Sequence, residues 1–138
     1  MPARDIFHQA VRTALETDGW TITDDPLLLE YGRQELYIDL GAEKVIAAEK
    51  NHRRIAVEIK TFLGASLITS FYGAVGQFIA YQTALESFQP DRILFLAVPA
   101  DVYLRFFLEP LVQAVVTRES IKLIVFDEVQ ERINSWIE

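Results

Sequence analysis

Residues 53–60 read Arg53-Arg54-Ile55-Ala56-Val57-Glu58-Ile59-Lys60, and this stretch sets the frame for the rest of the chain. We predict a β-strand here, and side chains along a strand alternate between its two faces. Ile55, Val57 and Ile59 would then point to one face, while Glu58 and Lys60 share the other. The strand would therefore bury one face and present an acid and a base on the other.

A second acid, Asp39, lies nineteen residues upstream within the run Leu36-Tyr37-Ile38-Asp39-Leu40. The same alternation places its carboxylate opposite the apolar side chains of that run. Two carboxylates and a lysine, each within an apolar strand, are what a hard divalent cation and a polarised water require. Asp39, Glu58 and Lys60 are therefore the candidate site.

Composition limits the classes of protein that this chain can belong to. Its 138 residues, half hydrophobic and a quarter charged, are typical of one globular domain spanning residues 1–138. The absence of cysteine excludes disulfides, thiolate catalysis and zinc-finger sites, and the two histidines, His8 and His52, cannot form a zinc cage alone. The chain opens without a signal-peptide pattern and contains no apolar stretch of about 18 residues, so we expect a cytoplasmic protein without a membrane span.

The net charge of −7 argues at first against nucleic acid, because phosphate binding usually relies on lysine and arginine. The charge is unevenly distributed, however. Residues 33–60 hold six of the thirteen basic residues against five acids, so the candidate site lies in the least acidic part of the chain. The alternative is that the basic residues of 44–54 only solvate a hairpin.

The hydrophobic pattern predicts an α/β domain with the element order αβββαβαβ and a short early strand. A helix over about 6–17 would begin after Asp5 as N-cap and end before Gly19. The turn Asp24-Asp25-Pro26 would follow the short early strand. The expected strands cover about 20–23, 35–40, 44–49, 53–60, 92–98, 121–126 and part of 129–137, and two further helices cover about 66–87 and 102–117, the second capped by Asp101. Residues 50–52 would join two strands as a hairpin, and the whole would form a mixed sheet flanked by helices.

Each candidate residue also has a structural interpretation. Glu58 and Lys60 would form a surface ion pair, worth about 0–1 kcal/mol. Asp39 would cap a turn at Gly41-Ala42. Five aromatic residues are expected in the core rather than in a base-stacking surface: Phe71, Tyr72, Phe78, Phe88 and Phe95.

The arrangement of residues 6–98 resembles the restriction-endonuclease-like, PD-(D/E)xK, fold. Asp39 in a strand, Glu58-Ile59-Lys60 on a hairpin strand and a long following helix carry the resemblance. It implies that Asp39 and Glu58 bind Mg²⁺ or Mn²⁺, with the Ile59 carbonyl as a third ligand. Lys60 would orient the attacking water or contact the scissile phosphate.

The same resemblance draws in residues from two helices. Gln77 occupies a place on the long helix where such nucleases often carry a polar residue that points at the site, and Tyr81 lies one turn further on. Both would otherwise be packing residues of a helix edge. In junction-resolving nucleases of this fold the first helix carries a glutamate where this chain has His8, and Glu16 lies two turns away. His8 would be a weaker ligand for a hard metal, or an ordinary surface histidine.

The whole chain resembles the XisH family, the fdxN element excision controlling factors. The resemblance rests on these segments: Pro2-Ala3-Arg4-Asp5-Ile6-Phe7-His8, residues 39–44 with 47–50, residues 55–62, Pro90-Asp91-Arg92 through Pro99, and residues 122–127. It implies an accessory role in the developmentally timed excision of a DNA element by a site-specific recombinase, alongside a small partner, XisI. It does not by itself imply that the chain cuts DNA.

Two functions of different classes follow from these patterns. The first is an accessory factor of DNA excision that acts through XisI and the recombinase. The second is a DNA endonuclease or junction resolvase dependent on Mg²⁺ or Mn²⁺, held in check by XisI, and a nuclease that cuts both strands would need two sites and hence a homodimer. The acidic composition and His8 favour the first, whereas Asp39, Glu58 and Lys60 together favour the second.

Overall fold

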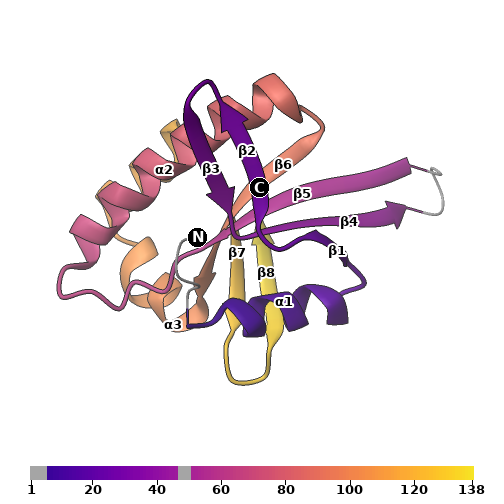
Figure 1. Ribbon diagram of the computed structural model, residues 1–138. Coiled ribbons are helices and arrows are strands. Elements are labelled where there is room, and N and C mark those ends of the chain that lie inside the picture. The colour runs from indigo at the N-terminus through magenta and orange to yellow at the C-terminus, as the bar shows by residue number, and fades with distance from the viewer. Residues whose placement is uncertain (1–5, 47–50) are drawn as a thin grey trace.

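The computed structural model of the protein describes residues 6–46 and 51–138 (Figure 1). The elements are α1 (His8–Thr17), β1 (Thr21–Asp24), β2 (Leu27–Tyr31), β3 (Gln34–Ile38), β4 (Leu40–Ile46), β5 (Asn51–Ile59), α2 (Leu67–Phe88), β6 (Arg92–Pro99), α3 (Ala100–Val102), the π-helical turn η1 (Tyr103–Phe107), α4 (Pro110–Arg118), β7 (Lys122–Asp127) and β8 (Arg132–Ile137). Within the described parts of the chain, none of the helices is long and apolar enough to cross a membrane.

Six strands form a mixed sheet in the order β1-β4-β5-β6-β7-β8, and β2 with β3 makes a separate hairpin. β4 pairs antiparallel with β1 and with β5, β5, β6 and β7 run parallel, and β8 returns antiparallel. The parallel step from β5 to β6 is made through α2, as a crossover between parallel strands requires. The mixed sheet flanked by helices that the sequence predicts is therefore confirmed.

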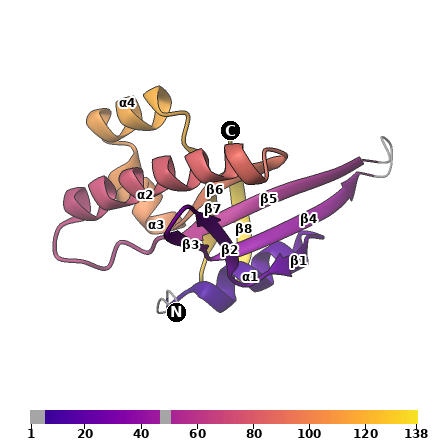
Figure 2. The same ribbon diagram turned by 45° about the horizontal axis from the view of Figure 1, so that its top comes forward.

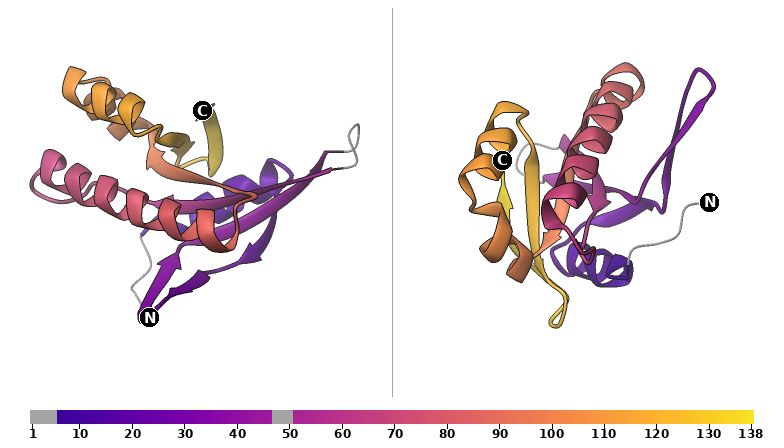
Figure 3. Two further views of the ribbon diagram at one scale, coloured as in Figure 1. Left: turned by 90° about the horizontal axis from the view of Figure 1, so that it is seen from above. Right: turned by 90° about the vertical axis from the view of Figure 1, so that its left-hand side faces the viewer.

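Helices cover both faces of the sheet, α1 on one side and α2 with α4 on the other (Figures 2 and 3). The core is divided in the same way. One buried cluster joins α1 to the side chains of Ile55, Val57 and Ile59, and the other joins α2 to Ala56. Strand alternation along β5 is thus as the sequence predicts, and Glu58 lies on the side of Ala56, facing α2.

The strands before β5 differ from the prediction. The predicted strand over 35–40 is interrupted by a bend at Asp39, so that β3 ends before this residue and β4 begins after it. β3 pairs with β2 (Leu27–Tyr31), a strand that the prediction missed. The hairpin between β4 and β5 exists and projects beyond the other strands (Figure 1), but Asn51 and His52, which were predicted in its turn, are paired residues of β5. Lys50 of the predicted turn and the predicted cap Asp5 lie outside the described residues.

The predicted helix over 102–117 is also divided. α3 and the turn η1 end at Phe107, and a new helix, α4, begins at Pro110. Proline lacks a backbone N–H and its ring clashes with the preceding turn, so a continuous helix cannot pass through this position. Asp101 lies in the first turn of α3 and pairs with Arg105 rather than capping the helix.

The predicted aromatic core is only partly correct. Phe71, Phe78 and Phe95 are buried, whereas Tyr72 is 60% exposed and Phe88 is 52% exposed. Phe88 lies at the end of α2 and contacts Tyr31 of the β2–β3 hairpin, with ring centroids 5.3 Å apart. The apolar positions of α2 therefore extend around the helix to its exposed side.

A buried arginine ties together the strands beneath the candidate site. Arg92, at the start of β6, donates to the Ile55 carbonyl at 2.8 Å and to Asp24 Oδ1 at 3.0 Å. Gly41 in β4 lies against this pair, since a Cβ atom at this position would stand 2.8 Å from the Asp24 carboxylate and 2.9 Å from the guanidinium. Contacts this short mean that a Cβ at position 41 would displace the ends of these two side chains, so glycine fits best here.

Candidate functional site

Asp39 and Glu58 lie close together, Asp39 between β3 and β4 and Glu58 near the end of β5. Asp39 occupies the bend between β3 and β4, and the β4–β5 register, in which Leu40 pairs with Val57, brings it beside the end of β5. The backbone N–H of Ile59 donates to Asp39 Oδ2 at 2.8 Å, and that of Asp39 donates to Glu58 Oε1 at 3.3 Å. Each carboxylate is therefore held by the backbone of the other segment.

Glu58 is strongly perturbed by this environment. Its side chain is buried, and burial followed by the negative charge of Asp39 raises the pKa of Glu58 to about 8, against the weaker opposing effect of Lys60. Two carboxylates in one buried place disfavour double ionisation. Near neutral pH the pair therefore keeps a proton unless a cation replaces it.

Lys60 lies beside the same pair. Its Nζ atom is 3.6 Å from Glu58 Oε2, and the Lys60 side chain is 30% exposed while that of Glu58 is 10% exposed. The ion pair that the sequence suggested is therefore present, but it is not a pair of two surface residues, because Glu58 is buried. Asp39 does not cap a turn at Gly41-Ala42 either, since both residues lie within β4.

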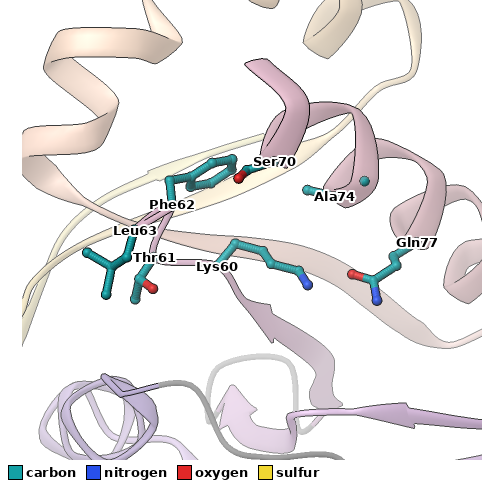
Figure 4. Close-up of a pocket in the computed structure, with 8 residues that line it drawn as sticks. Lys60, Thr61, Phe62, Leu63, Ser70, Ala74 and Gln77 are labelled. Carbon is teal, nitrogen blue, oxygen red and sulfur yellow. The ribbon is translucent and has the colours of Figure 1, made fainter. Parts of the chain in front are cut away.

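The long helix α2 contributes two further side chains. Tyr81 is buried, and burial together with the charges of Glu58 and Asp39 raises the pKa of Tyr81 to about 12. Tyr81 lies one turn beyond Gln77, on the same face of the helix. Gln77 is exposed, and its amide and the ammonium of Lys60 point toward one another (Figure 4). The two helix residues named from the sequence thus lie on the face of α2 that looks toward Glu58 and Lys60.

A cavity of about 430 Å³ lies between α2 and the loop after β5. The loop contributes residues 60–63 and the helix contributes Ser70, Gly73, Ala74 and Gln77. These helix positions have the spacing i, i+3, i+4 and i+7, which places them on one face. The sequence prediction missed the cavity residues other than Lys60 and Gln77, although this spacing was present as a signal.

The donor chemistry of the site fits Mg²⁺ or Mn²⁺. Two carboxylates, together with the Ile59 carbonyl, are oxygen ligands of the kind that these hard cations prefer. A cation between Asp39 and Glu58 would also relieve the repulsion that raises the pKa of Glu58. Over the described residues there is, however, no group of three or more histidine, cysteine or acidic side chains placed to hold a metal ion.

His8 is a buried residue, so its interpretation as a surface histidine is wrong. It is 4% exposed, its Nε2 atom lies 2.7 Å from Asp25 Oδ1, and the other carboxylate oxygen of Asp25 accepts from Arg12 at 2.6 Å. His8 therefore fastens the start of α1 to the bend between β1 and β2. Glu16 is half exposed and lies near Arg12, with 3.9 Å between Oε1 and Nε.

The basic residues near the hairpin have partners within the chain. Arg53 pairs with Glu138 at 2.6 Å and Arg54 with Asp91 at 2.7 Å. Lys44 donates to the Asp18 carbonyl at 2.8 Å and lies 5.8 Å from the centre of the Trp20 ring. These three side chains are therefore neither simply solvated nor directed together at a ligand.

Comparison with known proteins matches the whole length of the chain. The model of the XisH protein family matches residues 1–134. A crystal structure of an XisH family protein from Nostoc punctiforme PCC 73102 is 42% identical with a TM-score of 0.88, covering 97% of this chain and 100% of that one. A crystal structure of a fdxN element excision controlling factor protein from Anabaena variabilis is 43% identical with a TM-score of 0.88, covering 98% of this chain and 100% of that one. No match was found among curated proteins.

Proposed function

The chain belongs to the XisH family, and from this premise we propose that it controls the excision of a DNA element by a site-specific recombinase. The observation that carries the proposal is the 43% identity, over 98% of the chain, to the fdxN element excision controlling factor of Anabaena variabilis. We further propose that it acts with an XisI-like partner, as the family resemblance implies. The recombinase would carry out the strand exchange, and this chain would control its timing.

We also propose that the sheet is a restriction-endonuclease-like one. The arrangement in support is α1, the antiparallel strands β4 and β5, the crossover helix α2 and the parallel strand β6, with Asp39 and Glu58 at one end of the hairpin strands. On this proposal Asp39, Glu58 and Lys60 occupy the positions that such nucleases use for catalysis.

A second candidate function, cleavage of DNA, is favoured by one specific observation. Burial, and after it the charge of Asp39, raises the pKa of Glu58, and Lys60 Nζ lies 3.6 Å from Glu58 Oε2, an arrangement suited to a cation and a phosphate. Asp39, Glu58 and the Ile59 carbonyl would hold Mg²⁺ or Mn²⁺, which lowers the pKa of bound water and offsets charge on the phosphate. Lys60 would contact the phosphate, and Gln77 would orient the strand.

The accessory role ranks first for two reasons. His8 replaces the first-helix glutamate of junction-resolving nucleases and is held by Asp25, so it supplies no third acidic ligand. Lys44, Arg53 and Arg54 have partners within the described chain, and the net charge is −7, which disfavours the many phosphate contacts that duplex binding uses.

An excision assay tests the accessory role. A reporter element flanked by recombination sites is introduced into cells with the recombinase, with and without this chain and an XisI-like protein. Excision that rises about tenfold or more with the chain, and equally with its Lys60→Ala variant, is expected for an accessory factor that does not cut. Excision independent of the chain would overturn the proposal.

A cleavage assay tests the second candidate. Supercoiled, branched and single-stranded DNA are incubated with the chain and Mg²⁺ or Mn²⁺, with and without an XisI-like protein, beside Lys60→Ala and Asp39→Ala. Cleavage lost in both variants would establish the nuclease, whereas no cleavage of any substrate would remove it. Cleavage that both variants retain would point to a contaminating nuclease.

A further inference from the structure

We propose that the cavity between α2 and residues 60–63 binds one unpaired nucleotide of a DNA strand, with its phosphate at Lys60. The inference rests on the proposed function for the choice of DNA, and it adds the class of DNA that the site takes. It requires no cleavage, because it concerns binding alone.

The cavity has a size and a position suited to such a ligand. Its volume of about 430 Å³ falls within the range of about 300–1,000 Å³ that is usual for small-ligand pockets. Lys60 belongs both to the cavity wall and to the ion pair with Glu58, so the cavity begins directly beside the two carboxylates. A nucleotide bound there would bring its phosphate to the candidate site.

The wall of the cavity combines polar and apolar side chains. Lys60 and Gln77 face each other from opposite sides, as Figure 4 shows, and would contact a phosphate and its sugar. The 67% exposed Leu63 supplies apolar surface from the loop, whereas Phe62, which also lines the cavity, is only 7% exposed. Ser70 adds a hydroxyl from the helix. A nucleotide likewise combines a charged phosphate with a base whose faces are apolar.

The charges around the cavity favour an unpaired strand over a duplex. Duplex binding relies on many contacts between phosphates and lysine or arginine. The 22 residues of α2 include no basic residue, and Glu86 is their only charge. Lys60 is thus the one cation that lines the cavity within the described chain. Single strands also use a positively charged groove, but contacts to their bases add to the binding, and enzymes that act on a base enclose it in a pocket.

Gly73 makes the proposal testable without disturbing the fold. A Cβ atom built on Gly73, which lines the cavity, meets nothing within 4 Å, so a larger side chain would enter open space. Gly76 lies three residues further along the same helix, is also exposed, and also has no neighbour within 4 Å of a built Cβ, but it does not line the cavity. Leucine at either position would raise the helix propensity equally.

The experiment compares Gly73→Leu with its matched control Gly76→Leu. Binding of a fluorescent single-stranded DNA of 12 nucleotides is measured by anisotropy in EDTA, beside the blunt duplex and the RNA of the same sequence, with dTMP as a competitor. We expect the wild type to bind the single strand about tenfold tighter than the duplex. Gly73→Leu should weaken single-strand binding by about tenfold, as the loss of one base contact of about 1–3 kcal/mol implies, and Gly76→Leu by less than twofold.

Several outcomes would overturn the proposal. These are equal binding by Gly73→Leu and wild type, tighter binding of the duplex or of the RNA, and dTMP competition at the affinity of the DNA, which would assign the cavity to free nucleotides. Thermal unfolding of each variant checks the fold, and Gly73→Ala provides a smaller change if Gly73→Leu unfolds. The excision assay separates the two proposals. If excision needs the chain but the chain does not bind single-stranded DNA, only the proposed cavity ligand is rejected. If the chain binds single-stranded DNA but has no effect on excision, only the accessory function is rejected.

Discussion

Asp39 Oδ2 accepts a 2.8 Å hydrogen bond from the backbone N–H of Ile59. Asp39, one candidate metal ligand, therefore also fixes the end of β5, the strand that carries the other candidate ligand, Glu58. The side chain joins the bend between β3 and β4 to β5 at the point where Glu58 and Lys60 emerge. The geometry of the site and the local stability of the sheet therefore depend on the same carboxylate.

Asp39→Ala should lower the free energy of unfolding by about 1.5–3 kcal/mol, because the N–H of Ile59 loses a charged acceptor in a partly buried place. Asp39→Asn retains an acceptor oxygen without the charge, and we expect it to cost less than about 1 kcal/mol. Urea unfolding at pH 6 measures both values. An equal loss in the two variants would indicate that the charge rather than the hydrogen bond is responsible. Asp39→Asn is therefore the better variant for tests of activity.

The stability of the metal-free protein should fall as the pH rises from about 4.5 to about 8. The folded protein retains a proton on Glu58, whose pKa is raised to about 8, while the unfolded chain releases it near the ordinary value of 4.5. The contribution of Glu58 is therefore fully present below pH 4.5 and is lost as the pH rises through 8, by at most about 1.4 kcal/mol per pH unit.

Glu58→Gln isolates this effect, because glutamine carries no titrating group. Urea unfolding in EDTA across pH 4–9 gives the free energy of unfolding of wild type and of Glu58→Gln. As the pH rises, the wild type should become steadily less stable relative to the variant. A difference independent of pH would contradict the raised pKa.

Mn²⁺ should stabilise the protein at pH 8 through the two carboxylates. At a concentration 100 times its dissociation constant, a bound ion adds about 2.7 kcal/mol to the free energy of unfolding. The rise in Tm with Mn²⁺ should disappear in Asp39→Asn and persist in Lys60→Ala, which keeps both candidate ligands. A rise of the same size in Asp39→Asn would place the ion elsewhere.

Arg92→Ala should destabilise the protein by about 1–3 kcal/mol, because it removes a buried guanidinium that donates to the Ile55 carbonyl and pairs with the 32% exposed Asp24. Gly41→Ala should cost about 1–3 kcal/mol through its clash with the same pair. The double variant should lose less stability than the sum of the two single variants, because the guanidinium that the new methyl group would meet is no longer there. Strict additivity in urea unfolding would argue against the shared contact.

His8→Glu should destabilise the protein without adding a metal ligand. The new carboxylate would stand beside Asp25 where the two side chains are now only 5% and 11% exposed, and like charges in such a place repel. We expect a loss of about 2 kcal/mol or more at pH 8 relative to His8→Gln, and no increase in Mn²⁺ binding by calorimetry. A variant that is stable and binds Mn²⁺ more tightly would show that the first-helix position still reaches the site.

The parts of the fold that could be predicted from sequence are those governed by local periodicity. Alternation along residues 53–60 correctly separates Val57 from Glu58, and the apolar steps of 66–87 correctly predict α2. The β2–β3 hairpin is not predicted, although its signal is local, because the three successive leucines 27–29 show no alternation of apolar and polar residues. Gly32, with φ 61°, marks the turn of this hairpin. The break at Pro110 was likewise readable from the residue itself.

The parts that could not be predicted depend on residues distant in the sequence. Arg92 and Asp24 are 68 residues apart, and no local pattern marks a pair of this kind. The burial of His8 follows from its contact with Asp25, which exists only once α1 has packed beside the bend after β1. Asp39 and Glu58 were named from their types and strand positions, but their mutual hydrogen bonds depend on the register of β4 against β5.

The absence of a side chain at Gly41 has a consequence for how sequences of this family can diverge. Gly41 is required only while Arg92 and Asp24 meet in front of it. A lineage that loses the arginine frees position 41 for alanine or serine, and one that acquires a methyl at position 41 first must then relinquish the ion pair. Positions 24, 41 and 92 should therefore covary as one unit across homologues.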